Sequence, residues 1–325
     1  MYHSDQLLDM VNGHLSQMSY DRQPASLYEP IKYVLSIGGK RLRPVLTLMG
    51  YNLYREDPEK ILTQACALET YHNFTLLHDD LMDNADMRRG CPTVHRRWNA
   101  NTAILSGDTM LILAFQQMQQ RCDLPHLQPV MELFIETMLE IGEGQQMDME
   151  FETRQDVTVE EYIEMIRLKT SVLLACALKT GALLGDAPAS DVNNLYILGE
   201  RLGLAFQLQD DLLDVYGNPD VFGKAIGGDI MSNKKTFMLI SALNRADDKQ
   251  RKELEQWIST KDFNRAEKVR AVTSLYDQIG IRQLCEEKIK HYFDESRKSL
   301  DLIQLPAERK QMLSDYMDEL MLRES

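Results

Sequence analysis

The spacing of apolar residues constrains the fold of this chain more than any other feature. Apolar residues recur at intervals of three and four along almost all of its 325 residues, whereas the alternation typical of strands is nearly absent. An all-α bundle of about a dozen helices is therefore expected. The predicted helices lie near residues 5–18, 27–37, 44–53, 59–84, 100–120, 126–152, 159–183, 190–216, 234–244, 248–257, 264–276, 278–299 and 306–322.

Composition favours one large domain over residues 1–325. Hydrophobic residues make up 44% of the chain, enough for a sizeable core, and the ten prolines are scattered with no Gly/Ser-rich or Pro-rich linker between them. The net charge of −14 argues against a general nucleic-acid binder.

The cysteines and the N-terminus indicate a cytoplasmic protein. Five cysteines are odd in number and show no Cys-x-x-Cys spacing, which predicts reduced thiols and neither a zinc site nor a disulfide framework. The first residues lack the basic-then-apolar pattern of a signal peptide. The most apolar stretch, residues 171–184, is interrupted by Lys179 and Gly181 and is too short to span a bilayer, so no membrane span is expected.

Two acidic runs carry the chemistry. Residues 79–83 and 210–214 both read Asp-Asp-x-x-Asp, and each run lies near the C-terminal end of a predicted helix with apolar flanks. On a helix, the first and last aspartates of such a run lie on one face, where like charges destabilise the helix unless cations are present. Oxygen-only carboxylate ligands favour Mg²⁺ or Mn²⁺, and Mg²⁺ binds through one or two carboxylates plus substrate phosphates. One run alone is usually a solvated helix face, but two identical runs in matching settings indicate a metal site for a diphosphate substrate.

The glycine-rich segment 38–44 predicts an anion cradle. Gly38 and Gly39 allow the backbone to approach a ligand closely, and a helix expected to begin at Pro44 leaves free N–H donors. Lys40 and Arg43 are expected one helical turn apart beside them. The alternative interpretation is a solvated basic turn.

Further basic residues follow each acidic run. Arg88 and Arg89 come directly after the first, and guanidinium groups bind phosphate bidentately. Lys224 and Lys234 flank Gly227-Gly228-Asp229 after the second run, where plain ion pairs are the alternative. Lys169 is a weaker signal, because a lysine near the middle of a helix is usually exposed.

Together these elements resemble the trans-isoprenyl diphosphate synthases, or polyprenyl synthetases, of the short-chain type. The similarity runs in consistent order from about Gly38 to Lys234. The elements that match are Gly38-Gly39-Lys40-Arg41-Leu42-Arg43-Pro44, Asp79-Asp80-Leu81-Met82-Asp83 with Asp86-Met87-Arg88-Arg89-Gly90, Gln207-Leu208-Gln209-Asp210-Asp211-Leu212-Leu213-Asp214, and Gly223-Lys224 with Gly227-Gly228-Asp229-Ile230 and Asn233-Lys234.

The resemblance implies helices around a deep central cavity and a homodimer. It also implies head-to-tail (1′-4) condensation of isopentenyl diphosphate with an allylic diphosphate such as dimethylallyl, geranyl or farnesyl diphosphate, with Mg²⁺ as cofactor and Mn²⁺ as a substitute. Metal ions and basic side chains then stabilise the diphosphate that leaves, and an apolar cavity protects the allylic cation from water. The last proton passes to the released diphosphate, so no separate base is expected.

The resemblance also assigns roles residue by residue. The Mg²⁺ ligands are Asp79, Asp83 and Asp210, with Asp80 and Asp214 supporting that shell directly or through water. The allylic diphosphate is held by Arg88, Lys169, Lys224 and Lys234. The isopentenyl diphosphate is held by Gly39, Lys40, Arg43, His72 and Arg89. The oxygens of Thr170 and Gln207 face the reacting carbons.

Three alternatives remain open at this point. A terpene cyclase also ionises prenyl diphosphates, but such enzymes usually carry one Asp-rich motif with an Asn/Ser/Glu metal motif and need no second diphosphate site. A catalytically silent subunit of a heteromeric synthase commonly loses the acidic motifs, which are intact here. A metal-binding helical protein without catalysis does not explain the basic residues.

Residues upstream of the first acidic run predict the product length. The growing tail is expected to run back along the helix, and at about 1.5 Å per residue Phe74 lies about 7.5 Å from Asp79. Tyr71 is about one isoprene unit further. A bulky Phe74 beside the small Thr75 resembles enzymes that make C20 products, with C15 close behind. The alternative is that Tyr71 and Phe74 are ordinary core aromatics.

Overall fold

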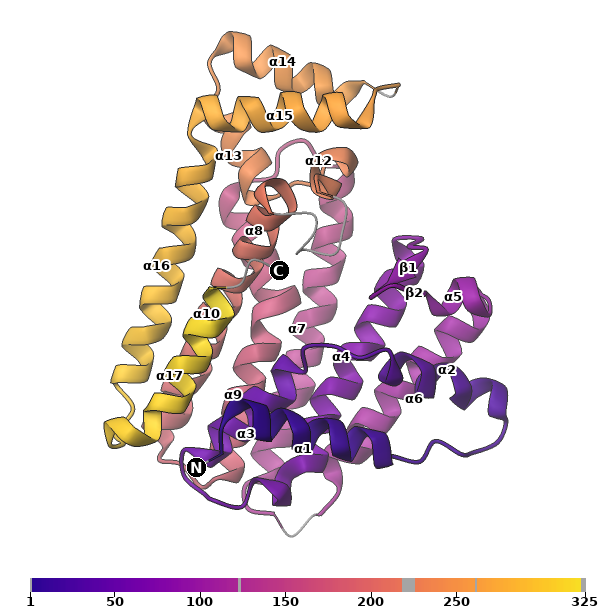
Figure 1. Ribbon diagram of the computed structural model, residues 1–325, viewed down its shortest axis with the longest axis vertical. Coiled ribbons are helices and arrows are strands. Elements are labelled where there is room, and N and C mark those ends of the chain that lie inside the picture. The colour runs from indigo at the N-terminus through magenta and orange to yellow at the C-terminus, as the bar shows by residue number, and fades with distance from the viewer. Residues whose placement is uncertain (1, 122–123, 218–225, 261, 323–325) are drawn as a thin grey trace. The chain divides into compact units, whose positions relative to one another are not determined.

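The computed structural model describes residues 2–121, 124–217, 226–260 and 262–322. Contacts divide the chain into two units. Unit 1 comprises residues 1–134, 176–195 and 305–312, and unit 2 comprises residues 135–175, 196–304 and 313–325. The boundaries fall inside four helices, α7 (Leu127–Thr153), α9 (Val172–Leu184), α10 (Ala189–Tyr216) and α17 (Ala307–Met321), which Figure 1 shows as continuous ribbons.

Almost all of the remaining elements are helical too, and the predicted all-α class is confirmed. Unit 1 holds α1 (Ser4–Gln17), α2 (Ala25–Ser36), α3 (Leu42–Asn52), a 3-10 turn (Pro58–Ile61), α4 (Leu62–Met82), the strands β1 (Met87–Arg88) and β2 (Cys91–Pro92), α5 (Val94–Arg97) and α6 (Ala100–Gln119). Unit 2 holds α8 (Val159–Ile166), a π-helix (Arg167–Ser171), α12 (Gly228–Ser232), α13 (Phe237–Arg245), α14 (Asp248–Ser259), α15 (Arg265–Ile279) and α16 (Ile281–Asp301).

Each predicted helix has a counterpart whose ends lie within a few residues of the expected ones. Side-chain caps explain several of the starts. Thr158 and Asp247 form capping boxes before α8 and α14, and Asn264 accepts a hydrogen bond from the first turn of α15. The sequence did not predict the short helices α5 and α12 or the antiparallel pair β1–β2.

Two details of the predicted helices differ from the structure. The segment expected to be one helix over 159–183 is divided by the π-helix, which carries Lys169 and Thr170. The helix expected to begin at Pro44 begins at Leu42, so Lys40 lies before it and Lys40 and Arg43 do not share a helical turn.

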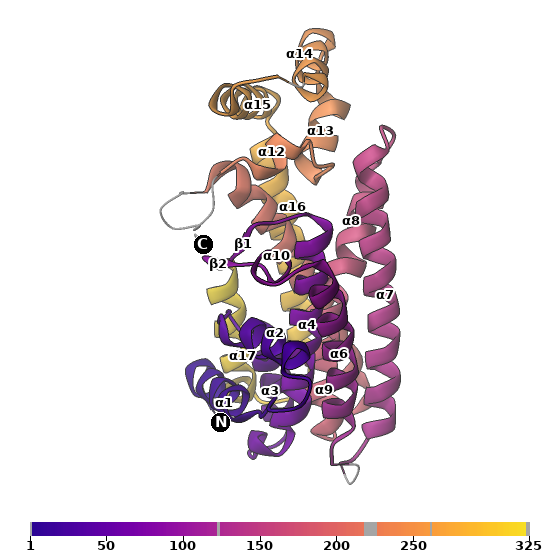
Figure 2. The ribbon, with the colours of Figure 1, turned by 90° about the vertical axis from the view of Figure 1, so that its right-hand side faces the viewer.

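The core of unit 1 forms around α4. Four consecutive residues of this helix, Ala65 to Leu68, are fully buried, and α4 packs side by side with α6 and α3 (Figure 2). Small residues also permit close helix contacts in this unit. A Cβ atom added to Gly181 of α9 would lie 2.0 Å from the carbonyl oxygen of Thr47 in α3.

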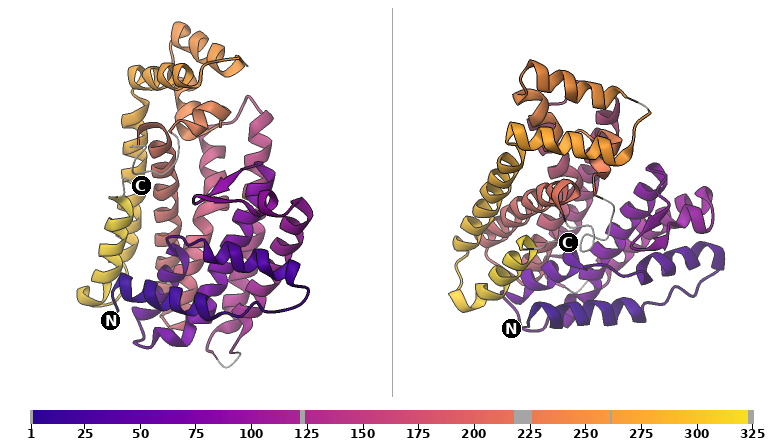
Figure 3. Two further views of the ribbon diagram at one scale, coloured as in Figure 1. Left: turned by 45° about the vertical axis from the view of Figure 1, so that its right-hand side comes forward. Right: turned by 45° about the horizontal axis from the view of Figure 1, so that its top comes forward.

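The core of unit 2 forms between α8, α10, α13, α15 and α16. Leu204, Leu208 and Leu212 give α10 a buried apolar stripe at helical spacing. Helices α14 and α15, both orange in Figures 1 and 3, lie side by side, and Gly280 at φ 79° separates α15 from α16.

Two further sequence expectations concern cysteines and membranes. Cys66, Cys91, Cys176 and Cys285 are free thiols, and Cys122 lies outside the described residues. Within the part of the chain that the structure describes, no helix has the length and apolarity needed to cross a membrane.

The glycine contacts predict opposite effects of alanine at two positions. Gly181→Ala forces a methyl group into the α3 backbone and should lower the free energy of unfolding by about 1–3 kcal/mol. Gly142→Ala in α7 is the control. Its Cβ would meet nothing within 4 Å, and alanine should stabilise this exposed helical position by about 0.5–1 kcal/mol. Urea unfolding midpoints measure both, and a wild-type midpoint for Gly181→Ala would contradict the close packing of α3 and α9.

Candidate active site

The first acidic run lies at the C-terminal end of α4, as predicted. Asp79 and Asp80 are in its last turn, and Asp83 is the C-cap residue, whose N–H donates to the Asp79 carbonyl at 2.8 Å. The end of a helix that exposes carbonyl oxygens carries partial negative charge, so carboxylates at this place increase the need for cations.

Asp80 holds the hairpin that follows. Its carboxylate is buried, and both of its oxygens accept from Arg88 Nε at 2.8 and 2.9 Å. Burial raises the pKa of Asp80, while Arg88 favours the charged form. Arg88 lies in β1, and Arg89 and Gly90 form the turn to β2 with positive φ angles of 51° and 74°. Asp80 therefore anchors the arginine pair, and Asp79 and Asp83 are the outer carboxylates of the run.

Gly39 and Arg89, predicted to share a ligand, are in contact. Arg89 Nη1 donates to the carbonyl oxygen of Gly38, and a Cβ atom on Gly39 would lie 2.7 Å from Arg89 Nη1. Gly39 also has a φ of 146°, which disfavours other residues. Glycine is required here both for its backbone conformation and for the close approach of the guanidinium group.

A buried ion pair explains why α3 begins earlier than predicted. Arg41 is the N-cap residue in the left-handed conformation, with its side chain buried. It donates to Glu69 Oε1 of α4 at 2.6 Å and to the Leu35 carbonyl at 2.7 Å. This inward pairing fixes the loop that carries Gly39 and Lys40, and the sequence alone did not predict that Arg41 is buried.

His72 is close to the arginines of this region. It lies half-buried on α4, where burial lowers its pKa well below the ordinary value. The positive charges of Arg43, Arg89 and Arg88 lower it further. His72 is therefore a neutral imidazole among arginines, and the structure brings it together with Arg43 and Arg89, two of the other residues predicted to hold isopentenyl diphosphate.

The predicted chain-length residues lie further up α4. Tyr71 is buried and Phe74 is half-buried, with their ring centroids 5.5 Å apart. Tyr71 also packs edge-to-face on Phe134, while Phe74 packs on His78 at 4.8 Å. The Thr75 hydroxyl donates to the His72 carbonyl at 2.8 Å. The two rings thus form one aromatic step beside the small Thr75.

The second acidic run lies near the C-terminal end of α10, in unit 2. Asp211 is buried and accepts from the Tyr162 hydroxyl and from Gln207 Nε2, and burial raises its pKa to about 6. Asp214 accepts from the Asp229 N–H at 2.9 Å. The second aspartate of each run, Asp80 or Asp211, is therefore engaged in hydrogen bonds within the protein. Asp210 holds the same position in its run as Asp79 does in the first.

Two of the predicted lysines meet at one carboxylate. The Nζ atoms of Lys169 and Lys234 lie 2.7 and 3.5 Å from the same Oδ2 atom of Asp148. Burial alone would lower the pKa of Lys234, but Asp148, Asp229 and Asp211 raise it above its ordinary value. Thr170 and Gln207, predicted to face the reacting carbons, are joined by a hydrogen bond of 3.1 Å. Lys224 lies outside the described residues.

The sequence interpretation did not identify Asp148 or Asp229. Asp148 is one of many acids along α7, and nothing in its spacing marks it. Asp229 lies in the segment Gly227-Gly228-Asp229, but the resemblance assigned this aspartate no role. Burial, followed by the negative charges of Asp211 and Asp214, raises its pKa to about 7.

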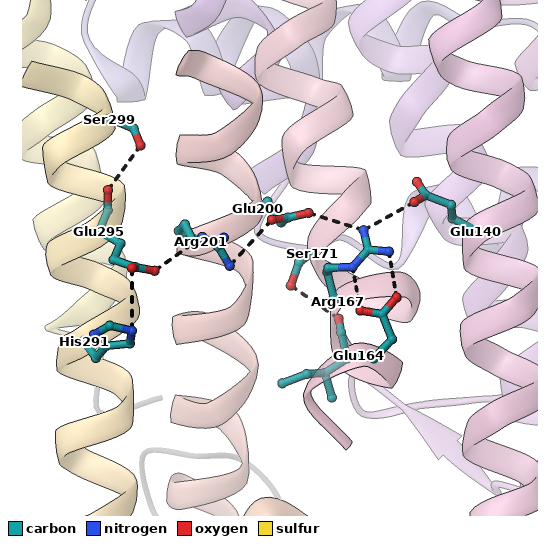
Figure 4. A network of polar contacts seen from close by, with 10 residues as sticks. Glu140, Glu164, Arg167, Ser171, Glu200, Arg201, His291, Glu295 and Ser299 are labelled. Carbon is teal, nitrogen blue, oxygen red and sulfur yellow. Dashed lines mark hydrogen bonds and ion pairs between the residues drawn. The ribbon is translucent and has the colours of Figure 1, made fainter. Parts of the chain in front are cut away.

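Arg167 fixes the π-helix that presents Lys169 and Thr170. Figure 4 shows its guanidinium between Glu164, Glu140 and Glu200, at 2.8, 3.3 and 3.3 Å. These acids come from α8, α7 and α10. The extra residue per turn in a π-helix is costly and is frequently found at functional sites. In addition, a Cβ atom on Gly203 of α10 would lie 2.6 Å from Ser171 Cα. The π-helix therefore packs directly against the backbone of α10.

Comparison with known proteins identifies the family. The family model described as polyprenyl synthetase matches residues 24–276. The chain belongs to this polyprenyl synthetase family. It is a prenyltransferase of the short-chain isoprenyl diphosphate synthase group.

The relatives named here each match 80% or more of the chain. The chain is 40% identical to a short chain isoprenyl diphosphate synthase of Methanocaldococcus jannaschii, over 80% of each chain. It is 37% identical to a geranylgeranyl diphosphate synthase of Methanosarcina mazei, over 94% of each. Among solved structures, a geranylgeranyl pyrophosphate synthase matches with a TM-score of 0.95 at 40% identity over 100% of both chains. The enzyme of that name from Pyrococcus horikoshii matches with a TM-score of 0.91 at 31% identity, over 98% of this chain and 97% of that one.

The shared contact with Asp148 predicts a loss of activity when its charge is removed. Asp148→Asn keeps the shape of the side chain but weakens the attraction that brings the two ammonium groups together. Turnover should fall by about 10- to 100-fold while the thermal midpoint stays close to wild type. Glu150→Gln, an exposed acid two residues further along α7, is the control and should leave initial rates unchanged. Wild-type rates for Asp148→Asn would exclude this role.

Proposed function

We propose that this prenyltransferase condenses isopentenyl diphosphate head-to-tail (1′-4) with allylic diphosphates and releases an all-trans C20 diphosphate as its main product. The observation that carries the proposal is that each unit contains an acidic run with its own set of basic side chains. Two separate anion-binding groups are what a reaction between two diphosphates requires, whereas a cyclase needs one.

The donor set fits Mg²⁺. Within the described residues, no three His, Cys, Asp or Glu side chains come close enough to hold a metal ion by themselves. Mg²⁺ typically keeps several waters and binds through one or two carboxylates plus substrate phosphates, so such a preformed cage is not required. Asp79, Asp83 and Asp210 are the residues that would hold it, with Asp80 and Asp214 in support. When bound, Mg²⁺ supplies Lewis-acid stabilisation of the leaving diphosphate.

In unit 2, the proposed allylic-diphosphate group consists of Lys169 and Lys234. The resemblance adds Lys224 and Arg88 to the residues that bind the allylic diphosphate. The contact of both ammonium groups with Asp148 keeps them close to one point, so they need little reorganisation to bind one diphosphate. Thr170, next to Lys169 in the chain, is joined to Gln207 by a hydrogen bond, and the dipoles of their side-chain oxygen atoms stabilise positive charge without forming a covalent bond.

In unit 1, the proposed isopentenyl-diphosphate group consists of Gly39, Lys40, Arg43, His72 and Arg89. Arg89 is held at its guanidinium by the Gly38 carbonyl, and the neutral His72 adds a hydrogen-bonding group without a further positive charge. We propose that both units belong to a single isoprenoid-synthase domain over residues 1–325.

Assembly as a homodimer is also part of the proposal. On α6, Leu105 and Ile112 are 58% and 68% exposed and lie seven residues apart, which places them on one helix face. An apolar face of this kind suits contact with a second copy. The free thiols at four of the five cysteines support a location in a reducing compartment, for which we propose the cytoplasm.

The proposed product length is supported by two observations, the names of the relatives and the aromatic residues of α4. Several relatives are geranylgeranyl diphosphate synthases, while one from Natronomonas pharaonis, 36% identical, is a geranylfarnesyl diphosphate synthase. The aromatic step formed by Tyr71 and Phe74 is the feature on α4 that we propose limits the tail at C20.

Chromatography of dephosphorylated products tests the function and its length limit together. Wild-type protein with labelled isopentenyl diphosphate and farnesyl diphosphate should give a C20 alcohol, and Phe74→Ala should lengthen the product by at least one isoprene unit because the step is removed. Phe293→Ala, which removes a half-buried ring from α16 in unit 2, is the control and should leave the length unchanged.

Other outcomes would be decisive. A cyclic hydrocarbon would indicate a cyclase, and the absence of any product would indicate a silent subunit. An unchanged length in Phe74→Ala would exclude Phe74 as the limit.

A further inference from the structure

Lys268 is the most deeply buried lysine described, and the proposed function gives it no role. Its side chain projects from α15 and is 1% exposed. Within the described part of the chain, its contacts are the amide oxygen Oδ1 of Asn233, 2.7 Å from Nζ, and the ring of Phe263, 4.3 Å from Nζ to the centroid. Neither partner is a carboxylate. A buried ammonium without an opposite charge is costly, and the hydrogen bond to Asn233 and the ring of Phe263 are the contacts that compensate it.

Asn233 is fixed by that contact and by a second one. Its Nδ2 donates to the carbonyl oxygen of Ile258 at the end of α14, at 3.1 Å. Both ends of its side-chain amide are therefore engaged, one by α14 and one by α15. Asn233 is the C-cap residue of α12 at φ 55°, a left-handed conformation that asparagine tolerates better than most residues.

Helix α12 depends on contacts at both ends because five residues are too few to form a stable helix alone. At its N-terminal end, the N–H groups of Gly227 and Asp229 donate to the carbonyl and carboxylate of Asp214, at 2.6 and 2.9 Å. Asp214 belongs to the second acidic run, so this anchor involves a residue of the proposed metal shell. The anchor at the C-terminal end, through Asn233 and Lys268, is independent of that run.

Helix α15 contacts both ends of α12. Besides Lys268 at Asn233, Val269 packs so closely on Gly227 that a Cβ atom there would lie 2.6 Å from Val269 Cγ2. Figure 1 shows α12 directly beside α15. Two adjacent residues of α15 thus support the short helix from one side.

Lys234 is the residue affected by this support. It directly follows Asn233, its N–H donates to the Asp229 carbonyl at 2.9 Å, and its Nζ lies 3.5 Å from Asp148. Any shift of the Asn233 backbone therefore moves the base of the Lys234 side chain, and with it the distance between its ammonium and that of Lys169.

We propose that Lys268 is a positioning residue for allylic-diphosphate binding: through Asn233 it holds the α12 turn that sets the place of Lys234. The inference rests on the proposed function, because it assigns Lys234 to the allylic substrate. Lys268 itself touches no substrate and acts only through Asn233.

The test is steady-state kinetics of Lys268→Met and Lys268→Gln holoenzyme with Mg²⁺. Methionine fills the same space without a donor, and the glutamine donor ends one bond short of Asn233. Each should raise the KM for farnesyl diphosphate by about tenfold and leave the KM for isopentenyl diphosphate within about twofold of wild type. Arg270→Met removes an exposed cation two residues further along α15 and should change neither constant.

Calorimetric titration with inorganic pyrophosphate and Mg²⁺ gives a readout without turnover, and both variants should bind the probe more weakly than wild type. If Lys268 were only structural, the variants would lose thermal stability and active fraction with both KM values unchanged, and that result would overturn the inference. Equal increases in both KM values would also overturn it. Wild-type protein that forms no prenyl product would instead overturn the proposed function, so the two failures are distinguishable.

Discussion

Concentrated negative charge with few cations beside it is the constraint on which the proposed site depends. In unit 2, Asp211 and Asp214 lie near the end of α10 and Asp229 lies close to them on α12. Burial and the negative charges of neighbouring aspartates raise the pKa of Asp211 to about 6 and that of Asp229 to about 7. Such a group is tolerated only where hydrogen bonds and cations compensate it. Tyr162, Gln207 and Lys234 supply part of that compensation, and the proposed metal-bound diphosphate supplies the rest.

The same constraint explains the surrounding architecture. Lys169 reaches Asp148 from a π-helix, an uncommon local structure that requires support from outside. Arg167 provides it by joining acids from three helices, and Arg201 extends the network from Glu200 to Glu295 on α16 (Figure 4). Lys234 is supported separately by α12 and, as we propose, by Lys268. The two ammonium groups thus meet at one oxygen because each is held by an independent set of contacts.

The sequence predicted what local patterns determine. The all-α class, the approximate helix ends and the placement of both acidic runs at C-terminal helix ends are confirmed, since periodicity and breaking residues encode them directly. The two-residue shift in the start of α3 was not predicted because Arg41 turns inward to Glu69, 28 residues away, and no local signal reports such a pair. The π-helix was missed because apolar spacing of three and four does not distinguish one extra residue in a turn. Asp148 and Lys268 were missed because their importance comes only from tertiary contacts, with Lys169, Lys234 and Asn233.

The central claim is that the two acidic runs serve one metal-dependent condensation. It is tested most directly by measuring product formation from isopentenyl and farnesyl diphosphates with Mg²⁺, after EDTA, and after Mg²⁺ is restored, in wild type, Asp79→Ala, Asp210→Ala and the exposed control Asp248→Ala. The account predicts that EDTA abolishes activity reversibly and that Asp79→Ala and Asp210→Ala each lose several orders of magnitude in turnover while remaining folded, whereas the control resembles wild type. Activity that persists in EDTA, or near-normal turnover in either run's variant, would contradict it.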